Sequence, residues 1–350
     1  MNIGHIFAHA ANNTGDIYLK QAVQMSFHNI FPQAIFHNVE IRKIYDESDI
    51  KALNNYDLLI IGGGGLLLRD TFPNDVSDWQ WGCSVELLNS IKTPIIVYAI
   101  GYNRFRMQDN FNTAVFNKHI QTLIDKSLFF SVRNSGSKAA LKEYISEDQY
   151  RKINLNFCPS ILYPQLVMDR KHNSGKIGFM LAGDRINLRH PDLPGFIEKV
   201  KSLLSRVSSE HDLYIVGHQP NDFWYLDELK GIPFQKIELI GLQPKDAIAF
   251  YTGMDVMIGD RGHSQMIPFG LGCKIISLIS HDKLRWFLDD INMNEYGIEE
   301  NDADLVDKVL AIISDKTDVY GNKRIEALRK ISKTHFLNLD TIYEKVMSAL

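Results

Sequence analysis

Short apolar runs and amphipathic stretches alternate along the first half of the chain. Continuous apolar runs are typical of buried parallel strands, and apolar residues three or four positions apart are typical of helices. The runs predict strands over residues 3–8, 38–41, 56–61, 94–100 and 129–132. The spaced pattern predicts helices over residues 17–31 and 135–145. This half therefore has the strand–helix rhythm of an α/β protein.

The same rhythm returns in the second half. Apolar runs predict strands over residues 176–181, 213–216, 236–240, 255–258 and 274–279. Amphipathic spacing predicts helices over residues 194–207, 243–251, from about Ser264 onward, and 284–289. Residues 302–350 are predicted to be helical, with no strand.

Strand–helix alternation with glycine after many strands indicates doubly wound parallel sheets. We predict two Rossmann-like domains, residues 1–170 and 171–350, with a polar, loop-like boundary near residues 164–174. A variant of this prediction has the terminal helices packing back on the first domain. Two such domains in tandem place a ligand cleft between the carboxyl ends of their strands.

Composition and charge narrow the function classes. A formal net charge of −4 argues against a partner that is a nucleic acid. The three cysteines are far apart, and no metal-binding spacing of Cys or His occurs, so neither a disulfide framework nor a metal site is predicted. The sequence shows no secretory signal pattern and no apolar segment of bilayer length. We expect a cytoplasmic enzyme without a transmembrane segment; a peripheral position at the inner membrane face stays open.

The turn after the first predicted strand holds Asn13, Gly15 and Asp16. Gly15 permits a tight turn, and the following helix offers unpaired N–H groups. Asp16 either caps this helix or acts as a base toward a sugar hydroxyl, and both hypotheses stand.

Further on, the strand over residues 56–61 runs into four glycines, which we expect to form a loop. Gly63 and Gly64 there either let a ligand approach the backbone or only permit the turn.

Cationic side chains follow several predicted strands. Arg104, Arg133 and Lys283 each lie just beyond one, where they form either an anion-binding wall or solvated surface. The segment from Gly259 to Gln265 is more specific, because Arg261 and His263 lie between an apolar strand and the next helix. A guanidinium and an imidazole at a helix start can hold a phosphate while the imidazole exchanges protons near neutral pH.

The order of these segments resembles the polysaccharide pyruvyltransferase family. The resemblance runs from about Gly4 to Ile291 and rests on five features in sequence order. They are Asn13-Thr14-Gly15-Asp16, YDLLIIGGGGLL at residues 56–67, SVRNSGSKAAL at residues 131–141, Cys158-Pro159, and Arg261-x-His263 followed by Asp282-Lys283. The chain departs from the family pattern at Asn134 and Ser160, where an Asp is usual, and at Gly262, where a bulky residue is usual.

The resemblance implies a GT-B-like pair of Rossmann domains. It also implies transfer of a pyruvyl group from phosphoenolpyruvate to sugar hydroxyls of a cell-surface polysaccharide precursor, free or lipid-linked, with formation of a ketal and no separate cofactor. The first domain is then the acceptor side and the second the phosphoenolpyruvate side. In this family the Arg-x-His pair is associated with the donor site, which carries over to Arg261 and His263.

Two other hypotheses remain open at this point. A nucleotide-sugar-dependent glycosyltransferase would use the same architecture. A glycan-binding relative without catalysis is suggested by Asn134 and Ser160, which lack the usual carboxylates.

Overall fold

The computed structural model describes residues 1–8, 12–163 and 175–350, so the predicted domain boundary at residues 164–174 lies outside the described residues. The first half forms a parallel sheet in the order β2-β1-β3-β4-β5-β6. Its strands are β1 (Asn2–Phe7), β2 (Ile35–Glu40), β3 (Leu58–Leu67), β4 (Ile95–Tyr102), β5 (Phe129–Val132) and β6 (Ile153–Leu155).

The second half forms another parallel sheet, in the order β12-β11-β10-β7-β8-β9. Its strands are β7 (Lys176–Met180), β8 (Asp212–Gly217), β9 (Gln235–Glu238), β10 (Val256–Gly259), β11 (Lys274–Ile279) and β12 (Gly297–Glu299). Both sheets are doubly wound, and the prediction of two Rossmann-like sheets is confirmed.

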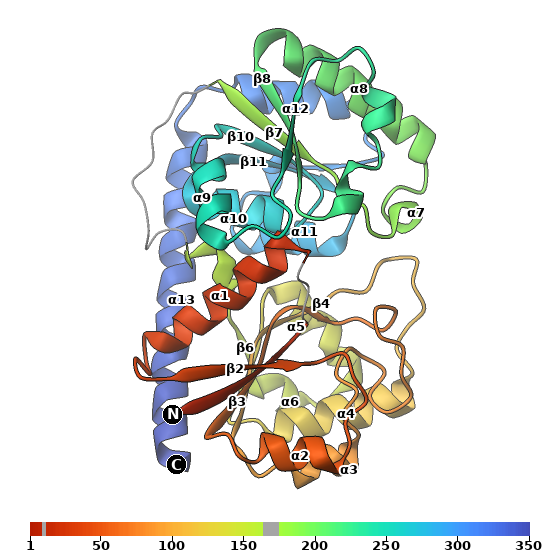
Figure 1. The fold of residues 1–350 in the computed structure, drawn as a ribbon. Coiled ribbons are helices and arrows are strands. Elements are labelled where there is room, and N and C mark those ends of the chain that lie inside the picture. Colours follow the sequence, from red (N-terminus) through yellow and green to blue (C-terminus); the bar gives the residue numbers. More distant parts are fainter. Residues whose placement is uncertain (9–11, 164–174) are drawn as a thin grey trace.

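Helices cover both sheets (Figure 1). Those of the first half are α1 (Thr14–His28), α2 (Glu47–Leu53), α3 (Val85–Ser90), α4 (Thr113–Lys126), α5 (Ser135–Leu141) and α6 (Glu147–Lys152). Those of the second half are α7 (Ile186–Arg189), α8 (Leu193–Glu210), α9 (Pro244–Thr252), α10 (His263–Leu271), α11 (Asp282–Asp290), α12 (Leu305–Ser314) and α13 (Val319–Ala349). Short 3-10 turns include η1 (Lys142–Tyr144), η2 (Pro159–Ile161), η4 (Pro220–Phe223), η5 (Leu226–Leu229) and η6 (Asn294–Tyr296).

The strand orders locate the ligand site. In a doubly wound sheet, ligands bind outside the carboxyl ends of the strands where the order reverses direction. In the first sheet this reversal falls between β1 and β3, and in the second between β7 and β10. The segments that follow these four strands are therefore expected to form the cleft.

The expectation of a glycine loop after residue 61 is wrong. β3 continues through the glycines, and Gly62 pairs with Tyr98, Gly64 with Ile100 and Leu67 with Tyr102 of β4, with a register shift before Leu67. Gly63 and Gly64 have φ of 80° and 106°, which side-chain-bearing residues rarely adopt. Glycine therefore lets the strand bulge and go on, instead of ending it.

The long helix α13 packs on both halves (Figure 1). Near its start, Tyr320 donates a hydrogen bond of 2.6 Å to the carbonyl of Cys273 in the second half. Near its end, Lys345 donates one of 2.7 Å to the carbonyl of Leu128 in the first half. One apolar core cluster accordingly joins side chains of both sheets with residues of α13.

Candidate active site

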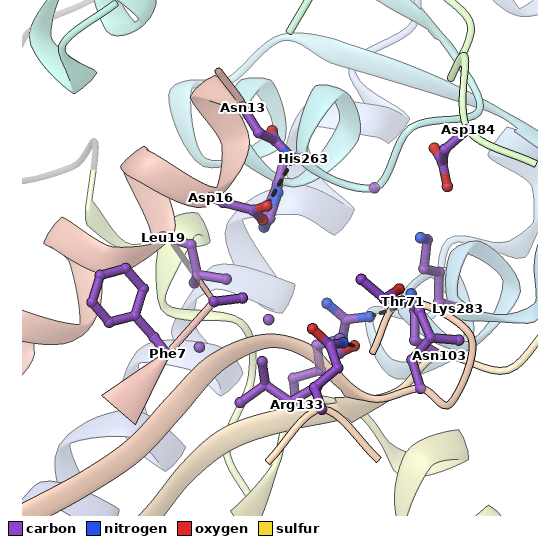
Figure 2. Close-up of a pocket in the computed structure, with 18 of the residues that line it drawn as sticks. Phe7, Asn13, Asp16, Leu19, Thr71, Asn103, Arg133, Asp184, His263 and Lys283 are labelled. Carbon is purple, nitrogen blue, oxygen red and sulfur yellow. Dashed lines mark hydrogen bonds between the residues drawn. The ribbon is translucent and has the colours of Figure 1, made fainter. Parts of the chain in front are cut away.

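A pocket of about 1220 Å³, including its open mouth, lies between the two sheets. The segments that follow β1, β7 and β10, together with the glycines of β3, contribute to its lining, as the strand orders predict. Figure 2 shows Asn13, Asp16 and His263 on one side of this pocket and Asn103 and Lys283 on the other. The pocket is therefore built jointly by both halves of the chain.

The start of α1 is fixed to the second half. Asn13 caps the helix by accepting from the Gly15 amide at 3.0 Å, and its own amide donates to Asp16 at 2.7 Å. The Thr14 backbone N–H donates to the carbonyl of His218 at 3.2 Å, and the Thr14 hydroxyl donates to the carbonyl of Leu239. These bonds hold the Asp16 carboxylate in the cleft, so the cap and the site share one segment.

His263 packs directly against the first turn of α1. A Cβ atom on Gly15 would lie only 2.5 Å from His263 Nδ1, so glycine is required for this approach. The other ring nitrogen, Nε2, is buried and has no hydrogen-bond partner among the described residues. Gly15 is not part of the pocket lining; it makes room for His263, which is.

Two carboxylates of the second half hold the Arg261 side chain in place. Its Nη2 donates to the fully buried Asp222 and lies 3.5 Å from Asp184, which follows β7. Its Nε is buried without a partner among the described residues. Despite burial, Asp222 and Asp184 raise the pKa of Arg261, so the guanidinium stays charged.

Arg133 and Lys283 have no carboxylate partner within ion-pair distance among the described residues. Arg133 donates to Asn103 at 3.3 Å, while its buried Nε has no partner there. Its guanidinium passes over Gly101, where a Cβ would lie 2.2 Å from Nε. Burial lowers the pKa of Arg133, and it lowers the pKa of Lys283 well below its ordinary value, helped by Arg189. Cations that are wholly or partly removed from water without a counter-charge are costly, and an anionic ligand would relieve that cost.

The same charges act on the two groups able to move protons. Burial, followed by the charges of Arg133, Lys283 and Arg261, lowers the pKa of His263 to about 3. Burial raises the pKa of Asp16, and Arg42 is the strongest of the cations that oppose this shift. Groups with perturbed pKa values gathered in one cleft are typical of an active site.

Most of the predicted site residues converge on this pocket. Those that line it are Asn13, Asp16, Gly63, Gly64, Arg133, Arg261, His263 and Lys283. Arg104 does not line it: its guanidinium donates to the carbonyls of Gln108 and Asp109 and lines a separate surface pocket. The position of Arg104 beyond β4 therefore serves a local turn.

The two departures from the family pattern also lie outside the lining. Asn134 caps α5 by accepting from the Ser137 amide at 2.7 Å. The Ser160 hydroxyl is buried 3.0 Å from the sulfur of Cys158. Neither substitution removes a carboxylate from the pocket, so they do not favour the hypothesis of lost catalysis.

Sequence patterning missed several residues of the pocket. Asp184, Arg185 and Arg189 follow β7, and Lys20 and Arg42 follow β1 and β2. The rule that residues after a strand face the cleft could have found Asp184 and Arg42. Arg189 and Lys20 lie within helices, where no local pattern sets them apart.

Within residues 1–8, 12–163 and 175–350, no three His, Cys, Asp or Glu side chains are grouped so that they could hold a metal ion. None of the helices described is both long and apolar enough to cross a bilayer.

Comparison with solved structures defines the fold class. S. aureus MnaA in its UDP co-structure aligns at 13% identity over 97% of both chains, with a TM-score of 0.56. UDP-GlcNAc 2-epimerase from Methanocaldococcus jannaschii aligns at 12% identity over 95% of this chain and 100% of its own, with a TM-score of 0.54. Anabaena HepE in complex with UDP aligns at 9% identity over 100% of both, with a TM-score of 0.58. These similarities confirm a GT-B-like fold.

Comparison of sequences defines the family. A family model of polysaccharide pyruvyl transferases matches residues 13–282, which include every predicted site residue except Lys283. No curated protein matches at the significance required. The chain belongs to the polysaccharide pyruvyl transferase family, and the resemblance inferred from its motifs is confirmed.

Proposed function

We propose that this chain transfers the pyruvyl group of phosphoenolpyruvate to two hydroxyls of a sugar in a cell-surface polysaccharide precursor, free or lipid-linked. The products are a cyclic ketal and inorganic phosphate. The observation that carries the proposal is that the cations Arg133 and Lys283, which have no ion-pair partner among the described residues, line one pocket with Arg261, His263 and Asp16. Phosphoenolpyruvate carries a phosphate and a carboxylate, which match such a set of donors.

The reaction needs two proton movements that these residues are suited to make. Arg261, with Lys283 and Arg133, holds the phosphate and carboxylate. His263, protonated when the phosphate is bound, donates a proton to the methylene carbon as the first sugar hydroxyl adds to C2, and Asp16 accepts the hydroxyl proton. A second hydroxyl then adds at C2 as the C2–O bond to phosphate breaks, and its proton leaves with the phosphate. Fixed cations stabilise the departing phosphate.

No cofactor beyond the donor is part of this scheme. Because phosphoenolpyruvate is a cytoplasmic metabolite, we propose that the reaction takes place in the cytoplasm, either free or at the inner membrane face.

A nucleotide-sugar donor is the competing proposal, because the structures similar in fold were solved with UDP or act on UDP-GlcNAc by name. The pocket gives it little support. Phe7 is the one Phe, Tyr or Trp among the described residues of the lining, so there is little surface on which a base could stack.

The test is to incubate the purified protein with phosphoenolpyruvate and a panel of glycan precursors, following phosphate release and the mass gain of the acceptor. We expect turnover that His263→Asn and Arg261→Gln abolish, while Lys51→Gln, an exposed residue of α2, retains it. Wild-type turnover by correctly folded His263→Asn protein would contradict the roles assigned. Thermal stabilisation by UDP-sugars but not by phosphoenolpyruvate would favour the competing donor instead.

A further inference from the structure

The cations that line the pocket differ in whether a carboxylate neutralises them. Arg185 pairs with Asp70 at 2.6 Å, Arg189 with Asp184 at 3.0 Å, and Arg261 with Asp222. Four others line the pocket without an ion pair to any residue that the structure describes. These are Lys20, Arg42, Arg133 and Lys283.

The four unpaired cations fall into two groups. Arg133 is buried and Lys283 is half-buried, and Lys283 Cε lies 3.7 Å from the position of a Cβ on Gly262, beside His263. Lys20 and Arg42 belong to the first-sheet side. Lys20 follows Asp16 by one turn of α1 and holds its Nζ 5.5 Å from the centroid of the Phe7 ring, while Arg42 lies beyond the edge strand β2.

Arg42 is held in a fixed orientation. Its Nε donates to the side-chain oxygen of Gln80 at 2.8 Å, and the Gln80 amide donates to the carbonyl of Gly65 at 2.9 Å. Gln80 is only 2% exposed, so this support is rigid. The two Nη groups of Arg42 donate to no described residue, which leaves the forked edge of the guanidinium available. That edge matches a phosphate or carboxylate in a bidentate geometry.

Arg42 also lies close to the proposed base. Of the cations that oppose the burial shift of the Asp16 pKa, Arg42 has the largest effect. An anion held by Arg42 and Lys20 would therefore lie near Asp16, within reach of the proposed base.

Charge matching shows that the donor does not account for this pair. The phosphate and carboxylate of phosphoenolpyruvate are matched by the charges of Arg133, Lys283 and protonated His263, while Arg261, already paired with Asp222, adds hydrogen-bond donors. Lys20 and Arg42 then remain as two positive charges facing the part of the pocket left for the acceptor.

We infer that Lys20 and Arg42 form a second anion subsite, which binds a phosphate or carboxylate group carried by the acceptor. That the ligand is the acceptor rests on the proposed function. The existence of the subsite rests only on the residues that line the pocket. The enzyme would thus select acceptors with an acidic group near the sugar that is modified, over neutral glycans.

The test uses calorimetry with the donor site filled by phospholactate, a donor analogue that lacks the reactive double bond. Inorganic phosphate, pyrophosphate and glucuronate are then titrated into wild type and variants. We expect each wild-type chain to bind one further anion. Arg42→Gln and Lys20→Gln should each lower the affinity for this anion roughly 10- to 100-fold. The matched control Lys51→Gln removes one exposed charge and should change the affinity by less than about twofold.

Two further variants separate position from charge. Arg42→Lys keeps the positive charge but loses the bidentate guanidinium edge. Gln80→Leu keeps Arg42 but removes the hydrogen bond that orients it. Both variants should bind the second anion more weakly while their thermal unfolding stays cooperative. Binding of phosphate or pyrophosphate supports a phosphorylated acceptor, and binding of glucuronate supports an acidic sugar. Absence of a second anion, or equal affinity in Arg42→Gln, overturns the inference. If phospholactate does not bind but phosphate binding still depends on Arg42, the donor proposal fails and the subsite stands.

Discussion

At the scale of single residues, the site is governed by excess positive charge. His263 is neutral at physiological pH, because burial and its cationic neighbours lower its pKa to about 3. A neutral imidazole cannot protonate the donor. The proposed mechanism therefore requires the substrate to restore the proton, and this requirement can be measured.

Binding of the donor should take up a proton at His263. A phosphate dianion offsets the charges of Arg133, Lys283 and Arg261, so the pKa of His263 rises on binding. A group whose pKa is higher in the complex contributes affinity below that pKa and loses it as pH rises through it. Affinity for phospholactate should then fall by up to about tenfold per pH unit between about pH 3, the pKa of free His263, and the pKa of the complex, and it should level off above the latter. Calorimetry in two buffers of different ionisation enthalpy measures the uptake; equal uptake by wild type and His263→Asn would contradict the prediction.

Arg261 should contribute to stability as well as to binding. Arg261→Gln leaves the buried Asp222 without its ion-pair partner, which costs about 3 kcal/mol in free energy of unfolding. Arg261→Lys keeps a positive charge beside Asp222, so it should lower the free energy of unfolding clearly less. It loses the bidentate geometry, however, and should weaken the binding of phospholactate as much as Arg261→Gln does. Urea unfolding and calorimetry on the two variants check both parts. Equal stability of the two variants would show that the ion pair with Asp222 does not hold this region.

At the scale of elements, helix α1 belongs to the first half and makes direct contacts with the second. Its first turn carries Asp16, receives His263 against Gly15, and bonds through Thr14 to His218 and Leu239 of the second half. Figure 1 shows α1 lying where the two sheets meet. The geometry of the site therefore depends on how closely this turn approaches α10.

Gly15→Ala should separate activity from stability. Alanine in place of a helical glycine ordinarily stabilises a protein by about 0.4–1 kcal/mol. Here the added Cβ would meet His263 Nδ1 at 2.5 Å, so the imidazole must move. We expect a loss of roughly 10²-fold in kcat/KM for phosphate release. The control Gly253→Ala, whose Cβ would meet only the Phe250 carbonyl at 3.4 Å, should retain activity. Unchanged kcat/KM in Gly15→Ala would show that the His263 position is not critical.

The elements show what the sequence could predict. Long apolar runs and regular helices were found because burial on both faces leaves a continuous signal, as in β3, β4, β11 and α8. The short elements α2, α3, α6, β6 and β12, and the longer α4, were missed, since few residues carry their pattern or their apolar residues are widely spaced. The glycines of β3 were placed in a loop because local propensity cannot register a bulge that pairing with β4 stabilises.

The site was predicted where it follows a strand directly, as at Arg261, His263 and Arg133. Pocket residues such as Lys20 and Arg189 were missed, because tertiary packing alone brings them into the site. Arg104 was wrongly placed in the site, because the prediction treated all strand ends alike. Which strand ends meet depends on the strand order, and the sequence alone does not specify that order.

At the scale of the whole molecule, the two halves are joined by more than the segment between the sheets. Arg185 of the second half pairs with Asp70 of the first, and the Ser135 amide donates to Asp290 at 2.9 Å. The helix α13 packs along both, with Leu339 buried in the core cluster that the halves share. A shared core of this kind predicts that the halves unfold together.

The three free cysteines make this testable, because Cys83 is buried in the first half and Cys273 in the second. Thiol labelling at increasing urea, read by mass spectrometry, should give both cysteines the same midpoint. Leu339→Ala removes buried apolar contacts of α13 and should lower the free energy of unfolding by about 2–5 kcal/mol. If the core is shared, the urea midpoints of Cys83 and Cys273 fall together, by that free-energy change divided by the m-value of unfolding, whereas the exposed control Glu344→Ala leaves both unchanged. A shift of the Cys83 midpoint alone would mean that the halves are independent and that the cleft is free to open by rotation about α13.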